Sequence, residues 1–156
     1  MVKTPIVILS IAGSDNSSGA GIQADIKTAL ILKAYCLNSL TTITAQNSKS
    51  VVKVEPVNKN LITLQIKSLI REYKVDCIKI GLVTNVETAK SITNVLKNMK
   101  DIPIIVDPIF KSSTNIFFQK KKDFINIYKI FSLLKPYLTP NYEEAKVLAD
   151  IQKKKI

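Results

Sequence analysis

The chain has 156 residues, 46% of them hydrophobic and 22% charged, which excludes a disordered tail and allows one domain with a substantial core. Its 23 basic and 12 acidic residues give a net charge of +11, but the lysines are scattered and lack the interleaved aromatic residues of a nucleic-acid platform. The absence of histidine excludes histidine acid–base chemistry, serine–histidine triads and histidine metal sites. We therefore expect no nucleic-acid partner, and any chemistry must use carboxylates, lysines, amides and backbone groups.

The cysteines and the apolar runs bear on the cellular compartment. Cys36 and Cys77 fall in apolar segments, where a buried, reduced thiol is expected rather than a disulfide. Residues 3–14 weakly resemble a signal peptide, but they lead directly into a turn and a helical pattern. No apolar run is long enough to span a membrane. We expect a cytoplasmic, soluble protein without membrane contact.

A glycine-rich turn lies between the first predicted strand and the first predicted helix. Residues 5–12 form a continuous run rich in β-branched residues, which predicts a strand buried on both faces, and a helix is predicted from about Ala20 to Ala34. Three glycines between them allow close backbone approach, and Asp15, Ser17 and Ser18 are able to cap the first N–H groups of the helix. The turn is therefore either a capped connection or a site for a polar or anionic ligand.

The rest of the chain alternates predicted strands with predicted helices. Strands are predicted at 36–45, ending at Gln46 and Asn47, and at 51–57, 75–80, 103–106 and 137–139. Helices are predicted at 60–73, at 86–99 after a cap at Thr84 or Asn85, at 123–134 and from Asn141 through Leu148, with a loop at 111–119. Because no linker and no repeat interrupts the alternation, residues 1–156 are predicted to form a single domain.

This alternation predicts an α/β fold with a mostly parallel sheet, right-handed crossovers and helices on both faces. In such sheets, ligands bind beyond the carboxyl ends of the strands. The polar or flexible residues that follow the predicted strands are 13–21, Gln46 and Asn47, Lys79 and Gly81, Asp107, Asn141 and Glu144. We expect one crevice to bring them together.

Two nucleotide-binding motifs can be weighed at the glycine-rich turn. Residues 19–24 fit the loose G-x-G-x-x-[GA] dinucleotide pattern, but the predicted strand ends several residues earlier and the second strand lacks the acid that would hold a ribose. A P-loop is excluded because Gly13 is not followed by Gly-Lys-[Ser/Thr]. Spacing alone therefore predicts a small-molecule site, and an NAD(P)-dependent oxidoreductase is the least favoured alternative.

Six stretches carry a family resemblance that covers nearly the whole chain. They read AGSD at 12–15, GAGIQADIKT at 19–28, AQN at 45–47, KIGL at 79–82, VDP at 106–108 and TPNYEEA at 139–145. In this order they resemble the hydroxymethylpyrimidine/phosphomethylpyrimidine kinases of thiamine biosynthesis, and the GAGIQAD run is highly specific. The resemblance implies a ribokinase-like three-layer sandwich. It also implies ATP-dependent phosphorylation of the hydroxymethyl group of 4-amino-5-hydroxymethyl-2-methylpyrimidine, and then of the resulting monophosphate.

The resemblance implies an aminopyrimidine-binding role for five residues. Gln46 matches the family's pyrimidine-recognising glutamine, since an amide can pair with an amino group and a ring nitrogen; alternatively it caps the backbone at a strand end. Gly13, Ala20 and Gly21 would let the backbone approach the substrate. Asp25 would give polar support from the first turns of the helix, or would only complement the helix dipole.

Three further residues match the phosphate side of the family site. Asn141 and Glu144 fit its Asn-x-x-Glu motif, which positions magnesium and phosphate, with Glu144 near Mg²⁺ through water; alternatively they form a capping box at the helix start. Asp107 either faces the phosphates or merely ends a strand. ATP and Mg²⁺ are the cofactors that the resemblance implies.

The chain departs from the family pattern within the glycine-rich turn. Asn16 stands where the family usually has proline, and Ser18 replaces the first of two paired glycines. If that position needs a positive φ, Ser18 carries strain of about 1 kcal/mol or more.

The larger departure concerns the family's nucleotide-binding half, with its Gly-Thr-Gly-Cys or Gly-Thr-Gly-Asp anion hole and base, which does not occur in the 156 residues. We therefore expect the amino-terminal half of the fold, with no catalytic residue of its own and impaired kinase activity. The alternatives are a pyrimidine-binding remnant without catalysis, or one half of a split enzyme that a carboxyl-terminal half complements. A homodimer, common in the family, is another assembly that the resemblance implies.

Overall fold

The computed structural model describes residues 5–99, 101–112 and 116–153, so residues 3 and 4 of the signal-like run and residues 113–115 of the predicted loop lie outside it. Its strands are β1 (Val7–Asp15), β2 (Tyr35–Gln46), β3 (Val51–Pro56), β4 (Cys77–Ile80), β5 (Ile104–Val106) and β6 (Tyr137–Leu138). Its helices are α1 (Gly21–Ile31), α2 (Lys59–Glu72), α3 (Val86–Leu96), α4 (Lys121–Phe131) with a short 3₁₀ helix, η1 (Ser132–Leu134), and α5 (Tyr142–Lys153). The predicted alternation of strands and helices is confirmed.

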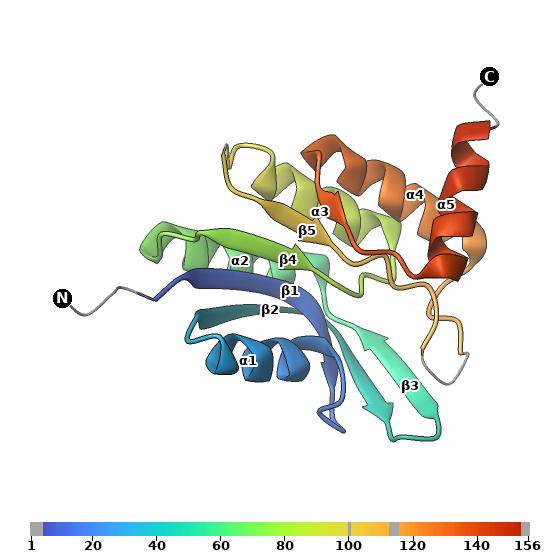
Figure 1. The fold of residues 1–156 in the computed structure, drawn as a ribbon, viewed down its shortest axis with the longest axis horizontal. Helices are drawn as coiled ribbons and strands as arrows, with labels where there is room; N and C mark the ends of the chain where they lie inside the picture. Colours follow the sequence, from blue (N-terminus) through green and yellow to red (C-terminus); the bar gives the residue numbers. More distant parts are fainter. Residues whose placement is uncertain (1–4, 100, 113–115, 154–156) are drawn as a thin grey trace.

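The six strands form one mostly parallel sheet in the order β3-β2-β1-β4-β5-β6 (Figure 1). All neighbours pair in parallel except β2 and β3, which are antiparallel and project from the body of the molecule as a two-stranded arm. The central position of β1 places its carboxyl end between those of β2 and β4. The residues that follow these three strands therefore meet at one edge of the sheet.

Helices cover both faces of the sheet, as predicted. Successive strand residues point to opposite faces, and Leu9 and Ile11 of β1 pack with residues of α2 and α3 in the main core, which continues to α4. Ser10, on the other face, donates a hydrogen bond to Asp25 of α1. Figure 1 accordingly shows α1 and α2 on opposite sides of β1 and β2. The core side chains are almost entirely aliphatic, with Phe131 the largest of those that are fully buried.

Several predicted ends are wrong: α3 ends at Leu96 rather than Met99, and α5 runs to Lys153 rather than Leu148. β1 continues past the predicted end at Ala12, because Ser14 and Asp15 pair with β2 beyond a bulge that follows Ala12. The helix α1 ends at Ile31 rather than Ala34. Lys33 adopts a left-handed φ of 56°, and the N–H of Ala34 donates to Ala29 O at 2.8 Å, which closes the helix without the glycine that usually marks such an end.

The predicted caps are only partly confirmed. Asn85, rather than Thr84, caps α3, since its side chain accepts a hydrogen bond from the N–H of Thr88 at 2.8 Å. In contrast, the N-cap of α1 is Ala20, which has no side-chain cap, so Ser17 and Ser18 do not cap this helix.

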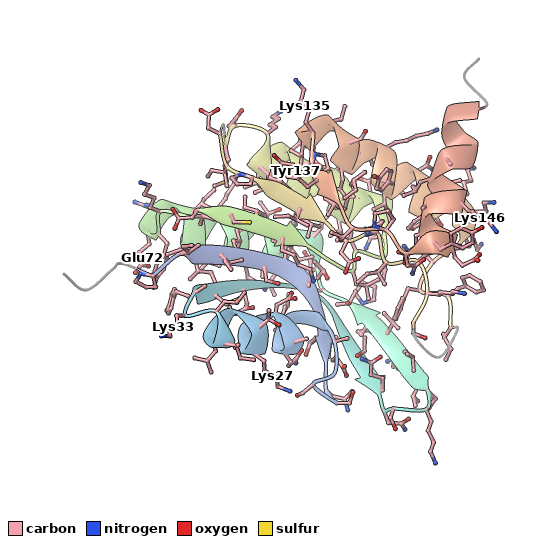
Figure 2. All side chains as sticks on the ribbon, viewed as in Figure 1. Lys27, Lys33, Glu72, Lys135, Tyr137 and Lys146 are labelled. Atoms are coloured by element: carbon pink, nitrogen blue, oxygen red, sulfur yellow. The ribbon has the colours of Figure 1, made fainter. Side chains whose placement is uncertain are left out.

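The distribution of surface lysines and the burial of the cysteines agree only in part with the sequence predictions. In Figure 2, Lys27 and Lys33 lie together near α1, whereas Lys135 and Lys146 lie on other sides of the molecule, so these four lysines do not gather at one patch. Among the described residues, no helix is both long and apolar enough to cross a membrane. Cys36 and Cys77 are free but only half-buried, and burial raises the pKa of both thiols.

Candidate functional site

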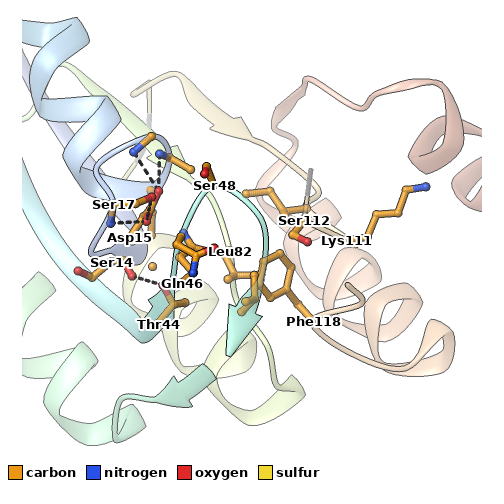
Figure 3. Close-up of a pocket in the computed structure, with 18 of the residues that line it drawn as sticks. Ser14, Asp15, Ser17, Thr44, Gln46, Ser48, Leu82, Lys111, Ser112 and Phe118 are labelled. Atoms are coloured by element: carbon orange, nitrogen blue, oxygen red, sulfur yellow. Dashed lines mark hydrogen bonds between the residues drawn. The ribbon is translucent and has the colours of Figure 1, made fainter. Parts of the chain in front are cut away.

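A cavity of about 640 Å³ opens at the carboxyl ends of β1, β2 and β4. Its wall is formed by the end of β1 with the glycine-rich turn, by the end of β2 with the turn that follows, by Lys79 and Leu82 at β4, and by Ile109, Lys111, Ser112 and Phe118 from the segment after β5. Figure 3 shows Asp15, Thr44 and Gln46 facing Phe118 across this space. Four predicted site residues, Gly13, Ala20, Gly21 and Gln46, line the cavity.

The carboxylate of Asp15 organises the turn between β1 and α1. Its Oδ1 accepts hydrogen bonds from the N–H and the hydroxyl of Ser17 at 2.8 and 2.7 Å. Its Oδ2 accepts from the N–H groups of Gly19 and Ala20 at 3.0 and 2.8 Å. Burial alone would raise the pKa of Asp15, but hydrogen bonds from Ser17, from the Gln46 side chain and from these backbone groups outweigh it and lower the pKa to about 2. The group is therefore ionised at neutral pH.

Two glycines allow this turn to lie against β1. Gly21 has a φ of +59°, and a Cβ atom there would lie 2.3 Å from the carbonyl oxygen of Gly13. A Cβ atom at Gly13 would lie 2.5 Å from Thr42 Oγ1 of β2. The turn therefore packs directly against the backbone of β1, and β1 packs closely against β2 at Gly13. Both glycines also line the cavity.

Gln46 ends β2 and lines the cavity. Its backbone N–H donates to Asn16 Oδ1 at 2.8 Å, so the side chain that replaces the family's proline ties the turn to β2. The side chain of Gln46 also helps to lower the pKa of the Asp15 carboxyl. The predicted site residue is therefore tied to the turn through its backbone.

Asp25 of α1 is held by an ion pair and a hydrogen bond. Its carboxylate accepts from Lys79 Nζ at 3.0 and 3.1 Å and from Ser10 Oγ at 2.6 Å. The two charged side chains are each about a quarter exposed, and Lys79 lines the cavity while Asp25 does not. The helix-dipole interpretation of Asp25 is not favoured, because α1 has no acidic residue in its first turn.

The Asn141 and Glu144 pair forms the predicted capping box at the start of α5. Asn141 Oδ1 accepts from the N–H of Glu144 at 3.0 Å, and Glu144 Oε2 accepts from the N–H of Asn141 at 2.9 Å. Glu144 Oε1 also accepts from the N–H of Phe110 at 3.2 Å, and the Glu144 residue is only 5% exposed. Neither residue lines the large cavity.

Asp107 directly follows β5 and lies on the same edge of the sheet. Its N–H donates to Ile80 O at 2.8 Å. Burial raises the pKa of its carboxyl; Lys79 opposes this effect, while Glu144 and Asp25 add to it. The charges of Asp25, Lys79 and Glu144 therefore all act on Asp107. Within 5–99, 101–112 and 116–153, no three His, Cys, Asp or Glu side chains are grouped to hold a metal.

Comparison with known proteins decides the family. A family model described as phosphomethylpyrimidine kinase matches residues 15–156. The chain belongs to the phosphomethylpyrimidine kinase family. It is similar to the hydroxymethylpyrimidine/phosphomethylpyrimidine kinase of Aquifex aeolicus, with 31% identity over 92% of this chain and 56% of the relative. The corresponding protein of Rhizobium meliloti is 33% identical over 91% of this chain and 53% of the relative.

Solved structures agree with this family assignment. A crystal structure of phosphomethylpyrimidine kinase from Clostridium difficile matches with a TM-score of 0.84 and 37% identity over 93% of this chain and 63% of that chain. Pyridoxal kinase from Staphylococcus aureus in complex with pyridoxal matches with a TM-score of 0.79 and 27% identity over 95% and 55%. The ribokinase-like α/β fold is thereby confirmed, and the chain spans about half the length of the bacterial kinases it matches in sequence.

Several cavity residues of this family member were not predicted as site residues. Ile109, Lys111, Ser112 and Phe118 come from a segment that the sequence marks only as a loop. Asp107-Pro108 is the sequence feature that could have indicated them. It ends a strand at the ligand-binding edge of the sheet, so the residues after it can form the cavity wall. Lys79 and Leu82 belong to the KIGL stretch, but that resemblance predicts no role for their side chains.

Proposed function

We propose that this chain supplies the pyrimidine-binding part of an ATP-dependent kinase that phosphorylates 4-amino-5-hydroxymethyl-2-methylpyrimidine and its monophosphate in thiamine diphosphate biosynthesis. The observation that carries the proposal is the cavity itself, in which Gln46 and the glycine-rich turn face one space of about 640 Å³. This volume lies in the range of about 300 to 1,000 Å³ that is typical of small-molecule sites. Family membership supplies the substrate class.

In this proposal Gln46 recognises the pyrimidine. An amide offers one acceptor and two donors, which match an exocyclic amine and a ring nitrogen. Gly13, Ala20 and Gly21 bring backbone to the ring, since two of these residues have no side chain and all three line the cavity. Asp25 supports the site through its ion pair with Lys79, which lines the cavity.

Asp107, Asn141 and Glu144 form the phosphate side in this proposal, with ATP as the phosphoryl donor. Each oxygen of Glu144 accepts one backbone N–H, which leaves lone pairs to accept hydrogen bonds from metal-bound water. This donor set suits Mg²⁺ held through water, because Mg²⁺ keeps several waters and takes other ligands from phosphates. Bound Mg²⁺ would neutralise charge on the transferring phosphoryl group. Asp107 and Glu144 would orient its waters.

Calorimetric titration tests the recognition role. The wild type is expected to bind the aminopyrimidine more tightly than an analogue without the exocyclic amine. Gln46→Leu should remove roughly 1 to 3 kcal/mol of that discrimination, the range of a bidentate amide contact to a base. Gln46→Glu should also weaken binding, because a carboxylate cannot donate to the ring nitrogen. Asn94→Leu, at an exposed amide of α3, is the matched control and should leave binding unchanged.

A phosphorylation assay separates catalysis from binding alone. The chain spans about half of its bacterial relatives, and this is the observation that favours a binding-only protein as the second candidate function. ATP-dependent formation of the pyrimidine monophosphate by the chain alone would support the kinase. Pyrimidine binding without turnover would support the second candidate. Turnover only after addition of a separate carboxyl-terminal segment would identify a split enzyme.

A further inference from the structure

The end of β1 has a strand neighbour on one side only. β1 pairs with β2 as far as Asp15, whereas its pairing with β4 ends at Ile11, whose carbonyl oxygen accepts the N–H of Gly81 at 2.9 Å. Among the described residues, no strand pairs with Ser14 and Asp15 on the side away from β2. The backbone groups on that side need another hydrogen-bond partner.

Gln23 of α1 supplies this partner. Its side-chain Oε1 accepts a hydrogen bond from the backbone N–H of Asp15 at 2.9 Å, and its Nε2 donates to Ser14 Oγ at 2.7 Å. A backbone N–H is only a donor, so the amide oxygen is the group that must face Asp15. Gln23 lies in the first turn of α1. Because helical side chains lean toward the N-terminus of their helix, its amide reaches back to the end of β1.

This contact reaches the cavity through Asp15. The carboxylate of Asp15 accepts the N–H groups of Ser17, Gly19 and Ala20, and Figure 3 draws hydrogen bonds of the turn that meet at this side chain. All four of these residues line the cavity. Gln23 itself is not among the described residues that line it. Gln23 therefore acts on the cavity wall by holding the main chain of Asp15.

We propose that Gln23 is a positioning residue for the ligand site. Its amide replaces a neighbouring strand at the end of β1, and so holds Asp15 and the glycine-rich turn in the shape that receives a ligand. A turn that is ordered before binding loses less conformational freedom when the ligand arrives, so the affinity is higher. The inference rests on the proposed function, in which this turn brings backbone to the pyrimidine. It gives a role to the glutamine of the GAGIQAD stretch.

Calorimetric titration of the full chain with 4-amino-5-hydroxymethyl-2-methylpyrimidine tests the effect on the ligand. Gln23→Met removes both hydrogen bonds and keeps a side chain of similar length, so the affinity should fall by roughly fivefold to tenfold. Gln65→Met is the matched control. Gln65 of α2 also accepts a strand N–H, that of Leu40 in β2 at 2.8 Å, and neither of these residues lines the cavity. This control should change the affinity by less than about twofold.

Two outcomes of the titration would overturn the inference. The first is an affinity that Gln23→Met leaves unchanged in a wild type that binds the pyrimidine. The second is an equal loss in Gln65→Met, because a loss of any helix-to-strand hydrogen bond would then weaken the ligand and the position of Gln23 would not matter.

Amide hydrogen exchange by NMR tests the contact without a ligand. In the wild type the Asp15 N–H should exchange at least about a hundredfold more slowly than an unstructured amide, because Gln23 protects it. In Gln23→Met this protection should fall by about tenfold or more, while the N–H of Gly81, which donates to Ile11, keeps its own.

The wild-type measurement needs no variant to fold, and an unprotected Asp15 N–H there would refute the role of Gln23. Equal protection in Gln23→Met would do the same. If the protection falls as expected but the wild type binds no pyrimidine, the role of Gln23 in holding the turn is supported and the proposed function fails.

Discussion

The carbonyl oxygen of Gly13 occupies the space that a side chain at Gly21 would need, with only 2.3 Å between that oxygen and an added Cβ atom. Gly21 also has a φ of +59°, in the left-handed region that favours glycine. These two residues therefore allow the start of α1 to lie close against the end of β1.

Gly21→Ala is therefore expected to lower the free energy of unfolding by about 2 kcal/mol or more, from backbone strain and from the clash with Gly13. Gly19→Ala is the control within the same turn. Its added Cβ would have its nearest contact at 3.6 Å, so its stability should stay within about 0.5 kcal/mol of the wild type. Urea denaturation measures both. Equal loss in the two variants would contradict the close approach as the cause.

Ser18 has a φ of 63°, so the strain predicted from its replacement of a family glycine is confirmed as a left-handed conformation. Ser18→Gly should raise the free energy of unfolding by about 1 kcal/mol, because glycine adopts this φ without a Cβ clash. Ser18→Ala removes the same hydroxyl but keeps the Cβ atom, so it should give no such gain. Thermal melting of the two variants distinguishes conformational strain from an effect of the hydroxyl group.

The low pKa of Asp15 predicts an acid-sensitive contribution to stability. The folded-state pKa of about 2 lies below the ordinary value of 3.8, so the ionised group stabilises the fold fully above about pH 4. This contribution, roughly 2 kcal/mol, should disappear as the pH falls from about 4 toward 2. Urea denaturation across this range should therefore find that the stability difference between wild type and Asp15→Asn shrinks. A difference that does not change with pH would refute the assignment.

The Lys79 and Asp25 ion pair should matter more than a surface pair. Lys79→Met leaves a partly buried carboxylate that still accepts from Ser10 but has lost its charged partner, so a loss of about 1 to 3 kcal/mol is expected. Lys90→Met breaks an exposed pair with Glu87 and should cost less than about 0.5 kcal/mol. Replacing both Lys79 and Asp25 with methionine should recover part of the loss. Denaturation of these three variants and the wild type completes the test.

The sequence predicts the sheet class, the order of elements and the edge at which the site lies, because apolar periodicity and glycine positions report burial and turns locally. It also predicts the capping box of Asn141 and Glu144 from spacing alone. It does not predict the pairing of Lys79 with Asp25, since their contact depends on how α1 crosses β1 and β4. The early end of α1 was missed because Lys33, not glycine, adopts the left-handed conformation there. The sequence also does not predict that Asp15, rather than Ser17 or Ser18, organises the turn. That role depends on β1 continuing past Ala12.

The strand order has a consequence for how the chain folds during synthesis. After β1, β2 and β3 have paired, β4 adds to the free edge of β1, β5 to β4 and β6 to β5, so no later strand has to insert between two that are already joined. Because domains begin to fold from the amino terminus as the chain emerges, the sheet can grow outward in one direction on a ribosome-bound nascent chain. The glycine-rich turn and Gln46 belong to the first strands of this sequence of events, so the walls that they contribute can be in place before α5 has been synthesised.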